Sequence, residues 1–320
     1  MIKIARLRNI EIIGAAVGCG APDQRTQEAA DWLRERGLEA ILQAAGLKSQ
    51  FEDIIRCENP ASQESLAENR IQALPAIADF SNRLAKKVRS SLTNGKFPVI
   101  VGGDHSCAIG TWSGIKAQMT GSLGLLWLDA HMDSHTSETT ESGAVHGMPL
   151  ASLLGYGDRR LTEVAGPIGK LNPQHVALMG IRSFEAGEET LLKNLGVRIF
   201  SDEEIKTRGF QICFQDALAI VQNGTQGFGM SLDLDGFDPR LVPAVGSPVR
   251  GGFTPKEVLR AFSTASRLDT FSALEIVEYN PFKDLDWKTF YLICDLIEAA
   301  LGERMMSFEA NSKYQDNAVS

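Results

Sequence analysis

The sequence has no excess of positive charge, and this excludes whole classes of protein. Its 320 residues contain 32 lysines and arginines against 40 aspartates and glutamates, a formal net charge of −8. Proteins that bind nucleic acid or an anionic membrane surface need a basic face, so neither kind of partner is expected. With 43% hydrophobic and 22% charged residues, the composition is that of a folded globular chain, not a disordered or fibrous one.

Cysteines are few and apolar runs are short. The five cysteines are scattered and form no C-x-x-C pair, so neither a disulfide framework nor a thiolate zinc cluster is predicted. No stretch approaches the roughly 18 uninterrupted apolar residues that span a bilayer. Residues 1–18 lack the long apolar core and clear cleavage site of a signal peptide. We therefore expect a cytoplasmic protein with reduced thiols and no membrane segment.

Short apolar segments alternate with segments of helical periodicity. The expected strands are apolar on both faces, as parallel strands covered by helices must be. They span residues 10–13, 98–101, 124–128, 175–179, 197–200, 228–234 and 273–277. The expected helices span residues 27–45, 66–92 with a break at Pro75, 255–266 with Thr254 as N-cap, and 285–301.

This alternation predicts the fold class and the domain organisation. Strand, helix, strand, helix in this order indicates a three-layer α/β/α sandwich with a mostly parallel, doubly wound central sheet. Residues 1–306 are expected to form a single catalytic domain, and residues 307–320 a polar C-terminal tail.

Four of the expected strands run directly into polar motifs. The motifs are GGDHS at 102–106, DAHMD at 129–133, DLDGFDP at 233–239 and EYNP at 278–281. Open α/β sheets bind ligands beyond the carboxyl ends of their strands, so the motifs are expected around one site. The chain has five histidines, and four of them lie between residues 105 and 146: His105, His131, His135 and His146.

The acidic residues of these motifs have the spacing of metal ligands. In DAHMD, acid, histidine and acid alternate along an extended chain, so their side chains are expected on one face. Crowded, buried carboxylates repel each other and are costly to ionise, and a divalent cation relieves both penalties. The candidate ligands are His105, Asp129, His131, Asp133, Asp233 and Asp235. Four carboxylates and two imidazoles suit two metal ions; they favour Mn(II), with Fe(II), Co(II) or Ni(II) as alternatives and zinc less favoured.

Two such metal ions point to a reaction type. At about 3.5–4 Å apart they can share a water and lower its pKa, so the sequence predicts metal-assisted hydrolysis. Taken alone, GGDHS could be a glycine-rich turn and DLDGFDP a turn before Pro239; their occurrence together at strand ends favours the metal site. Asp104 and Asp238 are interpreted as turn residues or as residues that orient the ligands.

The set of motifs resembles the ureohydrolase family of arginases, agmatinases and related guanidino hydrolases. The family pattern GGDHS, DAHxD, HG, SxDxDxxDP and E-x-NP occurs in this order at residues 102–106, 129–133, 146–147, 231–239 and 278–281. SGAVHGMP at 142–149 and DGFDP at 235–239 are more similar to arginases than to agmatinases. The resemblance implies an arginase-like fold, hydrolysis of a guanidino group to urea plus an amine, and homo-oligomers, either trimers or hexamers.

The resemblance also implies roles for single residues. One manganese ion would be held by His105, Asp129, Asp133 and Asp233, and the other by His131, Asp129, Asp233 and Asp235. The implied catalytic residues are His146, Asp133 and Glu278. His146 would be a proton shuttle or general acid, because the leaving amine must be protonated; the alternative is a hydrogen-bonded loop histidine. Glu278 would pair with the substrate guanidinium; the alternative is a surface salt bridge.

The part expected to bind the far end of the substrate departs from the arginase pattern. Arginases usually carry asparagine at the positions of His135 and Ala144, and their GxRDxDPGE loop is GIRSFEAGE here, at 180–188. The candidate substrate-binding residues are His135, Ser142, Glu185, Glu188 and Glu278. L-arginine is the leading hypothesis, with guanidinobutyrate, guanidinopropionate or agmatine as alternatives, because mispaired polar groups discriminate strongly between substrates. A catalytically silent family member with a regulatory role is the second class of hypothesis.

Overall fold

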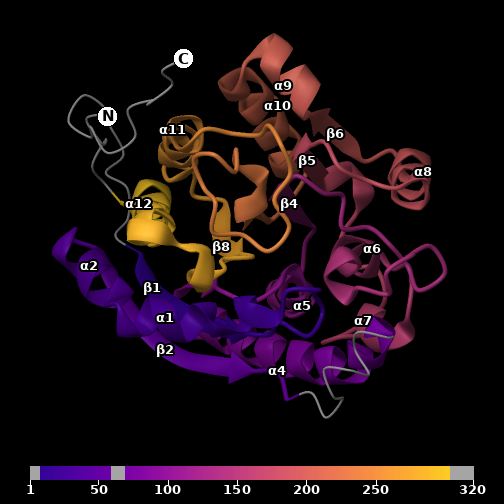
Figure 1. The fold of residues 1–320 in the computed structure, drawn as a ribbon, viewed down its shortest axis with the longest axis horizontal. Helices are drawn as coiled ribbons and strands as arrows, with labels where there is room; N and C mark the ends of the chain where they lie inside the picture. Colours follow the sequence, from indigo (N-terminus) through magenta and orange to yellow (C-terminus); the bar gives the residue numbers. More distant parts are fainter. Residues whose placement is uncertain (1–7, 59–68, 303–320) are drawn as a thin grey trace.

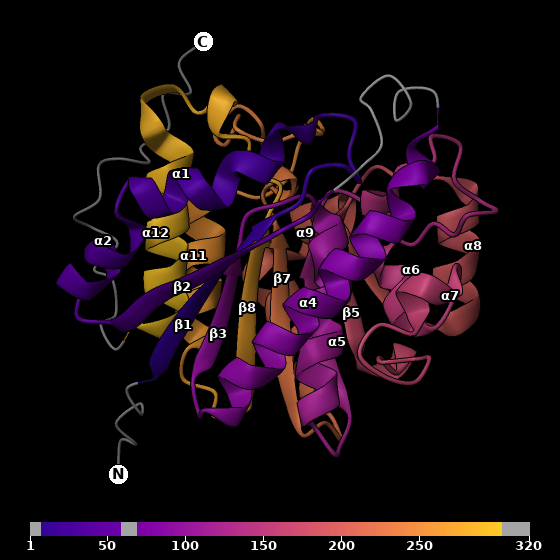
Figure 2. The same ribbon diagram turned by 90° about the horizontal axis from the view of Figure 1, so that it is seen from below.

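The computed structural model describes residues 8–58 and 69–302. Within them one eight-stranded sheet forms the centre of the molecule, and every pair of neighbouring strands is parallel. The strand order is β2-β1-β3-β8-β7-β4-β5-β6 (Figure 2). The strands are β1 (Asn9–Ala16), β2 (Lys48–Arg56), β3 (Phe97–Val101), β4 (Leu123–Leu128), β5 (Val176–Ile181), β6 (Arg198–Ser201), β7 (Gly227–Asp233) and β8 (Phe271–Val277).

Helices cover both faces of this sheet (Figure 1). On one face lie α1 (Ala29–Glu35), α2 (Leu38–Ala44), α10 (Phe210–Gln222), α11 (Pro255–Ala265) and α12 (Lys288–Leu301). On the other lie α4 (Leu74–Thr93), α5 (Ala108–Gln118) and α6 (Pro149–Leu154). The remaining helices are α7 (Arg159–Thr162), α8 (Ala186–Leu195) and α9 (Asp202–Arg208).

Successive residues of a strand point alternately into the two hydrophobic cores, one on each face of the sheet. In β1, Ile10 and Ile12 belong to one buried cluster, and Ile13 and Ala15 to the other, as the two-residue period of a strand requires. Both faces of the sheet are therefore apolar. For this reason the central strands could be predicted from short apolar segments of the sequence. The predicted three-layer α/β/α sandwich is confirmed, and within the described residues its sheet is entirely parallel.

Several details of the prediction were wrong. Strand β2 was not predicted, because it lies at the edge of the sheet and mixes buried and exposed residues, unlike the strands covered on both faces. The helix expected over 27–45 is divided, because Gly37 adopts a left-handed φ of 80° between α1 and α2. Pro75 begins α4 instead of breaking it, since a helix tolerates proline in its first turn.

The C-terminal part of the chain was predicted only in part. The helix expected over 285–301 starts at Lys288, because Asp286 and Trp287 have positive φ. The polar tail expected at 307–320 lies outside the described residues. No helix of the described chain combines the length and the hydrophobicity needed to cross a membrane.

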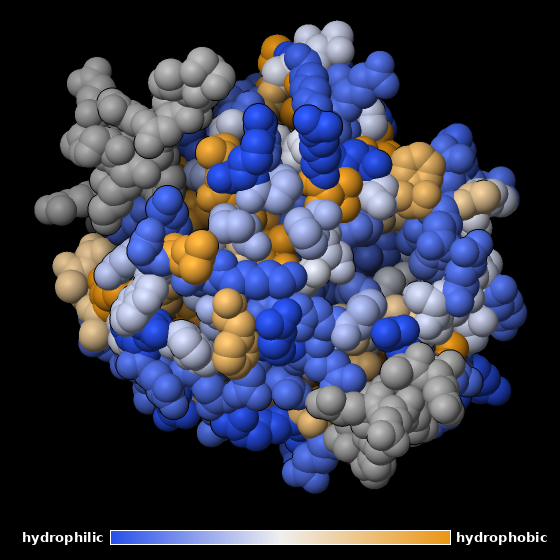
Figure 3. All heavy atoms as spheres, viewed as in Figure 1, coloured by the Kyte–Doolittle hydropathy of each residue, from blue (hydrophilic) through white to orange (hydrophobic). Residues whose placement is uncertain are grey.

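The strand order explains how the polar motifs meet. The four motif-bearing strands β3, β8, β7 and β4 are consecutive in the sheet. Because they are parallel, all four end at the same edge, toward which Figure 1 looks. The segment 182–188, which includes the start of α8, follows β5, the next strand in the sheet. The sphere view of this side shows a mainly hydrophilic surface on which hydrophobic side chains form small, separate groups (Figure 3).

Candidate active site

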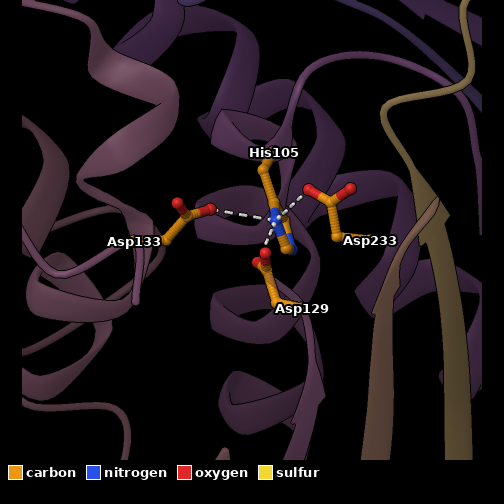
Figure 4. Close-up of side chains that lie close together, drawn as sticks. All are labelled: His105, Asp129, Asp133 and Asp233. Carbon is orange, nitrogen blue, oxygen red and sulfur yellow. Dashed lines mark ion pairs between the residues drawn. The ribbon is translucent and has the colours of Figure 1, made fainter. Parts of the chain in front are cut away.

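Three carboxylates surround one nitrogen of His105 (Figure 4). Its Nδ1 lies 3.2 Å from Asp129 Oδ2, 2.9 Å from Asp133 Oδ2 and 3.0 Å from Asp233 Oδ2. All four side chains are almost completely buried. This Nδ1 is nevertheless without a hydrogen-bond partner among the described residues. A nitrogen aimed between three oxygens, with no hydrogen bond of its own, is the arrangement of a ligand set for a cation.

A second group lies beside the first. His131 Nδ1 is 3.1 Å from Asp235 Oδ2 and 3.6 Å from Asp129 Oδ1, and these three residues could hold a metal ion together. Asp129 is a member of both groups, offering Oδ2 to the first and Oδ1 to the second. A carboxylate shared in this way is suited to bridge two cations. The bridging role expected of Asp233 stays a prediction.

Burial and charge act against each other in these groups. Burial lowers the pKa of His105, but Asp129, Asp133 and Asp233 outweigh it and raise that pKa well above its usual range. Burial, and next the charge of Asp129, raise the pKa of Asp133 to about 7. Burial and the charge of Asp235 raise the pKa of Asp233 well above its usual range. Dications would relieve this repulsion, so the residues present fit a pair of divalent metal ions.

A chain of hydrogen bonds holds His105 from behind. Its Nε2 lies 3.0 Å from Ser231 Oγ, which donates a 2.6 Å hydrogen bond to Glu275 Oε2. Trp112 Nε1 donates to the same carboxylate oxygen at 3.0 Å. In the neutral imidazole Nε2 therefore carries the proton, and Nδ1 is the nitrogen available as a ligand. Sequence reasoning missed Glu275, although a carboxylate inside the apolar segment FSALEIV was the available signal.

Trp127 supports both groups from the strand itself. Its ring stacks on the His105 imidazole at 4.1 Å, and its Nε1 donates a 2.8 Å hydrogen bond to Asp129 Oδ2. This residue was also not predicted, because a tryptophan within an apolar strand is typical of a hydrophobic core.

His146 and Glu278 form a third feature at the same edge. His146 Nδ1 lies 3.0 Å from Glu278 Oε1, and that oxygen also accepts the backbone N–H of His105 at 3.0 Å. The other oxygen, Oε2, is buried without a hydrogen-bond partner in the described chain. Glu278 has a φ of 62° and Asp133 one of 46°, both in the left-handed region. Such strain is typical of residues whose side chains are held for a function.

A cavity opens over these groups. It is lined by His131, Asp133, His135, Ser142, Ala144, His146, Gly147, Ser183, Phe184, Glu185, Glu188, Asp233, Asp235 and Ser247. Four of the five predicted substrate-binding residues thus line it. Glu278 does not, and contacts the cavity through His146. Phe184, which is 46% exposed, and Ser247 were not predicted. Phe184 lies in the compared loop at 180–188 but has no polar group, and the segment around Ser247 carries no motif.

The distal wall of the cavity is acidic. His135 Nε2 lies 3.3 Å from both Glu185 Oε2 and Glu188 Oε2. Glu188 also accepts the backbone N–H groups of Ser134 at 3.1 Å and of Glu185 at 2.9 Å. Glu185 has a half-exposed side chain, so it is the carboxylate most available to a ligand. Ser142 Oγ accepts the N–H of Ala144 at 3.2 Å.

Comparisons with known proteins agree with this geometry. The model of the Arginase family matches residues 8–302. The chain is 34% identical to the arginase of Bacillus caldovelox over 302 residues, covering 94% of this chain and all of that one. The chain belongs to the arginase family. It is 33% identical to the arginase of Brevibacillus brevis over 93% of this chain and 99% of that protein.

Solved structures of arginases show the same architecture. The Bacillus caldovelox arginase superimposes with a TM-score of 0.86, covering 93% of this chain and all of that one. The Entamoeba histolytica arginase, solved in complex with L-ornithine, does so with a TM-score of 0.84 at 25% identity, over 93% and 99% of the two chains. This arginase-family protein is therefore a hydrolase that acts on guanidino groups.

Proposed function

We propose that this arginase-family protein is a binuclear manganese hydrolase that converts L-arginine to L-ornithine and urea. The observation that carries the proposal is the pair of ligand groups that share Asp129 beneath one cavity. The oxygen-rich donor set without thiolates supports manganese, with cobalt, nickel or iron as alternatives. The arginases that resemble this chain, one of them solved with L-ornithine, support the substrate.

The metal ligands we propose are His105, Asp129, His131, Asp133, Asp233 and Asp235. When bound, two dications would polarise a water and the guanidinium carbon and so supply the hydrolytic chemistry. Asp133 accepts a hydrogen bond from the attacking water and orients it. Glu278 pairs with the guanidinium through the free Oε2. His146, in its protonated form, gives a proton to the leaving amine.

The far end of the substrate meets the distal wall of the cavity. We propose that Glu185, with Glu188 beside it, pairs with the α-ammonium group, and that Ser142 and His135 donate hydrogen bonds to the α-carboxylate. Ala144 offers no side-chain donor for this carboxylate, which keeps guanidinobutyrate, guanidinopropionate and agmatine as alternatives. Urea release from manganese-loaded protein, compared as kcat/KM for L-arginine and these three alternatives, tests the proposal. A larger kcat/KM for another compound would reassign the substrate. No urea from any of them, in protein that holds two metal ions, would favour a silent regulatory member.

The remaining proposals concern the state of the protein. Residues 1–306 are proposed to act as one catalytic domain, in the cytoplasm. A homo-oligomer, trimer or hexamer, is supported by large exposed hydrophobic side chains that gather near the start of α12: Phe282, Leu285, Trp287 and Tyr291. Light scattering tests the oligomer, and a monomer at micromolar concentration would contradict it.

A further inference from the structure

The ends of two neighbouring strands bring two thiols together. Cys57 directly follows β2, and its N–H donates a 2.8 Å hydrogen bond to the carbonyl of Ala16, the last residue of β1. Cys19 lies in the turn that follows β1. The Sγ atoms of Cys19 and Cys57 are 3.5 Å apart, although the two residues are separated by 38 positions. All five cysteines are free thiols in this structure.

We infer that Cys19 and Cys57 form a reversible disulfide on contact with a low-molecular-weight disulfide such as oxidised glutathione, and that this bond lowers turnover. The proposal goes beyond guanidino hydrolysis and does not depend on which guanidino compound is the substrate. It assigns the pair as a redox modification site next to Gly20, which contacts Asp104 and the backbone of His146.

The exchange takes place in two balanced steps. The thiolate of one cysteine attacks the small disulfide, so that a mixed disulfide forms and one glutathione thiolate leaves. The second cysteine loses its proton and attacks the protein sulfur of that mixed disulfide, releasing the second glutathione. Two protein thiols are thereby oxidised to one disulfide, and one glutathione disulfide is reduced to two thiols.

The different exposure of the two cysteines determines which of them reacts first with the external disulfide. Cys57 is half-buried, whereas Cys19 is 5% exposed, so the external disulfide reaches Cys57 first. The hydrogen bond with Cys57, and next burial, raise the pKa of the Cys19 thiol. Cys19 is therefore the poorer nucleophile toward an external disulfide, and it acts as the resolving thiol, losing its proton when it attacks the mixed disulfide on the adjacent Cys57 sulfur.

Gly20 connects this pair to the proposed active site. Its N–H donates to Asp104 Oδ2 at 2.8 Å, and its carbonyl accepts the N–H of His146 at 3.2 Å. A Cβ on Gly20 would lie 3.0 Å from both carboxylate oxygens of Asp104, so the turn has no free space on that side. The segment next to Cys19 is thus packed tightly against the residue that precedes His105 and against the backbone of His146.

Forming the bond moves this segment. An S–S bond is about 2.05 Å long, so the two sulfurs must approach each other by about 1.5 Å. Movement of Cys19 shifts Gly20, and with it the backbone of His146, which donates a hydrogen bond to the Gly20 carbonyl. The His146 side chain must keep its position beside Glu278. A displacement of about 1 Å in a catalytic group can cost up to about a hundredfold in rate, so a fall of tenfold or more is expected.

The test treats manganese-loaded, full-length protein with oxidised glutathione and reads three quantities. Peptide mapping without reduction is expected to show the Cys19 and Cys57 peptides linked, with a loss of about 2 Da relative to the two thiols. The kcat for urea release is expected to fall at least about tenfold with metal content unchanged, and dithiothreitol to restore it. In a metal-free sample, which avoids the broadening caused by paramagnetic Mn(II), the NMR signal of the His146 Cε1–H is expected to shift on oxidation.

Matched variants separate the pair from other thiols. Cys57→Ser is expected to keep its activity and to resist oxidised glutathione, while Cys213→Ser responds like the unmodified protein. Absence of the linked peptide, or a linked peptide with kcat and the His146 signal unchanged, would overturn the inference. If no guanidino compound releases urea, the proposed function fails, whereas the linked peptide and the His146 signal still decide this inference.

Discussion

His146 Nδ1 and Glu278 Oε1 are 3.0 Å apart, although the two residues are separated by 132 positions in the sequence. Burial lowers the pKa of His146, but the hydrogen bond and charge of Glu278, with the charges of Asp133 and Asp104, raise it to about 9. At neutral pH the imidazole therefore carries the proton that a leaving amine needs. The second oxygen of the same glutamate, Oε2, is buried without a hydrogen-bond partner among the described residues.

Replacing His146 by alanine should lower turnover without loss of metal. Removing a general acid costs about 10²- to 10⁴-fold in rate, so kcat for urea release should fall within that range. Metal analysis of the same preparation should still give the wild-type content. His175→Ala is the matched control, since His175 precedes β5, away from the site. Loss of the metals from His146→Ala would make this residue a ligand instead of an acid.

Glu278→Gln should lower the pKa of His146 from about 9, because it removes the negative charge that stabilises the imidazolium. With the pKa lowered, the protonated fraction of His146 declines at lower pH, so the alkaline limb of the pH–kcat profile should move to lower pH. KM should rise for every guanidino compound, because the carboxylate partner of the guanidinium is lost. The pH–kcat profile and an NMR titration of His146 measure the change in pKa, and steady-state kinetics measure KM. Unchanged kinetics would make Glu278 a structural residue.

Asp129→Ala should remove both metal ions, because this carboxylate belongs to both ligand groups. Residues that only orient ligands are worth about 10- to 100-fold in metal affinity, so loss of the shared ligand should exceed that range. Calorimetry with Mn(II) measures the affinity, and urea release should fall with it. Asp238→Asn serves as control, since Asp238 pairs with Arg240 outside both groups. Two bound metals and full activity in Asp129→Ala would refute the bridging role.

Metal binding should release protons and strengthen as pH rises. In the metal-free protein, burial lowers the pKa of His105 and His131, but the neighbouring carboxylates outweigh it and raise both above their usual range. Asp133 has a pKa raised to about 7, so it also holds a proton at acidic pH. Because each ligand must lose its proton, calorimetry in buffers of different ionisation enthalpy should show a net release of protons near neutral pH. Affinity that is the same at pH 6 and pH 8 would contradict this.

Ala144→Asn should improve the use of L-arginine. The new amide would donate to the substrate carboxylate, and a hydrogen bond to a charged group is worth about 1.5–3 kcal/mol, or roughly tenfold or more in KM. Agmatine has no carboxylate and should show no gain, so the ratio of the two kcat/KM values is the measurement. An unchanged ratio would show that the missing amide does not limit arginine binding.

The residues that the sequence identifies best are those whose spacing matches local backbone geometry. The alternation in DAHMD predicts Asp129 and His131 on one side of the chain, and the two share a ligand group, although residues 130–131 form a bend after β4 and are not extended. Apolar residues on both faces of 124–128 mark a central strand. Strand β2 was missed because an edge strand needs no such pattern. Glu275 and Trp127 were missed because their function depends on a neighbour, Ser231 or His105, that is distant in sequence.

By itself, then, the sequence determined the α/β class, the apolar strands and the identity of the polar residues at their ends, because these follow from periods of two and of about 3.6 residues along one chain. Only the tertiary structure decided that β3, β8, β7 and β4 are neighbours, that Glu278 reaches His146 and that Cys19 meets Cys57. Such contacts join segments that are distant in the sequence; His105 and Glu278, for example, are 173 residues apart. They depend on the order in which strands pack into the sheet, which no local period encodes.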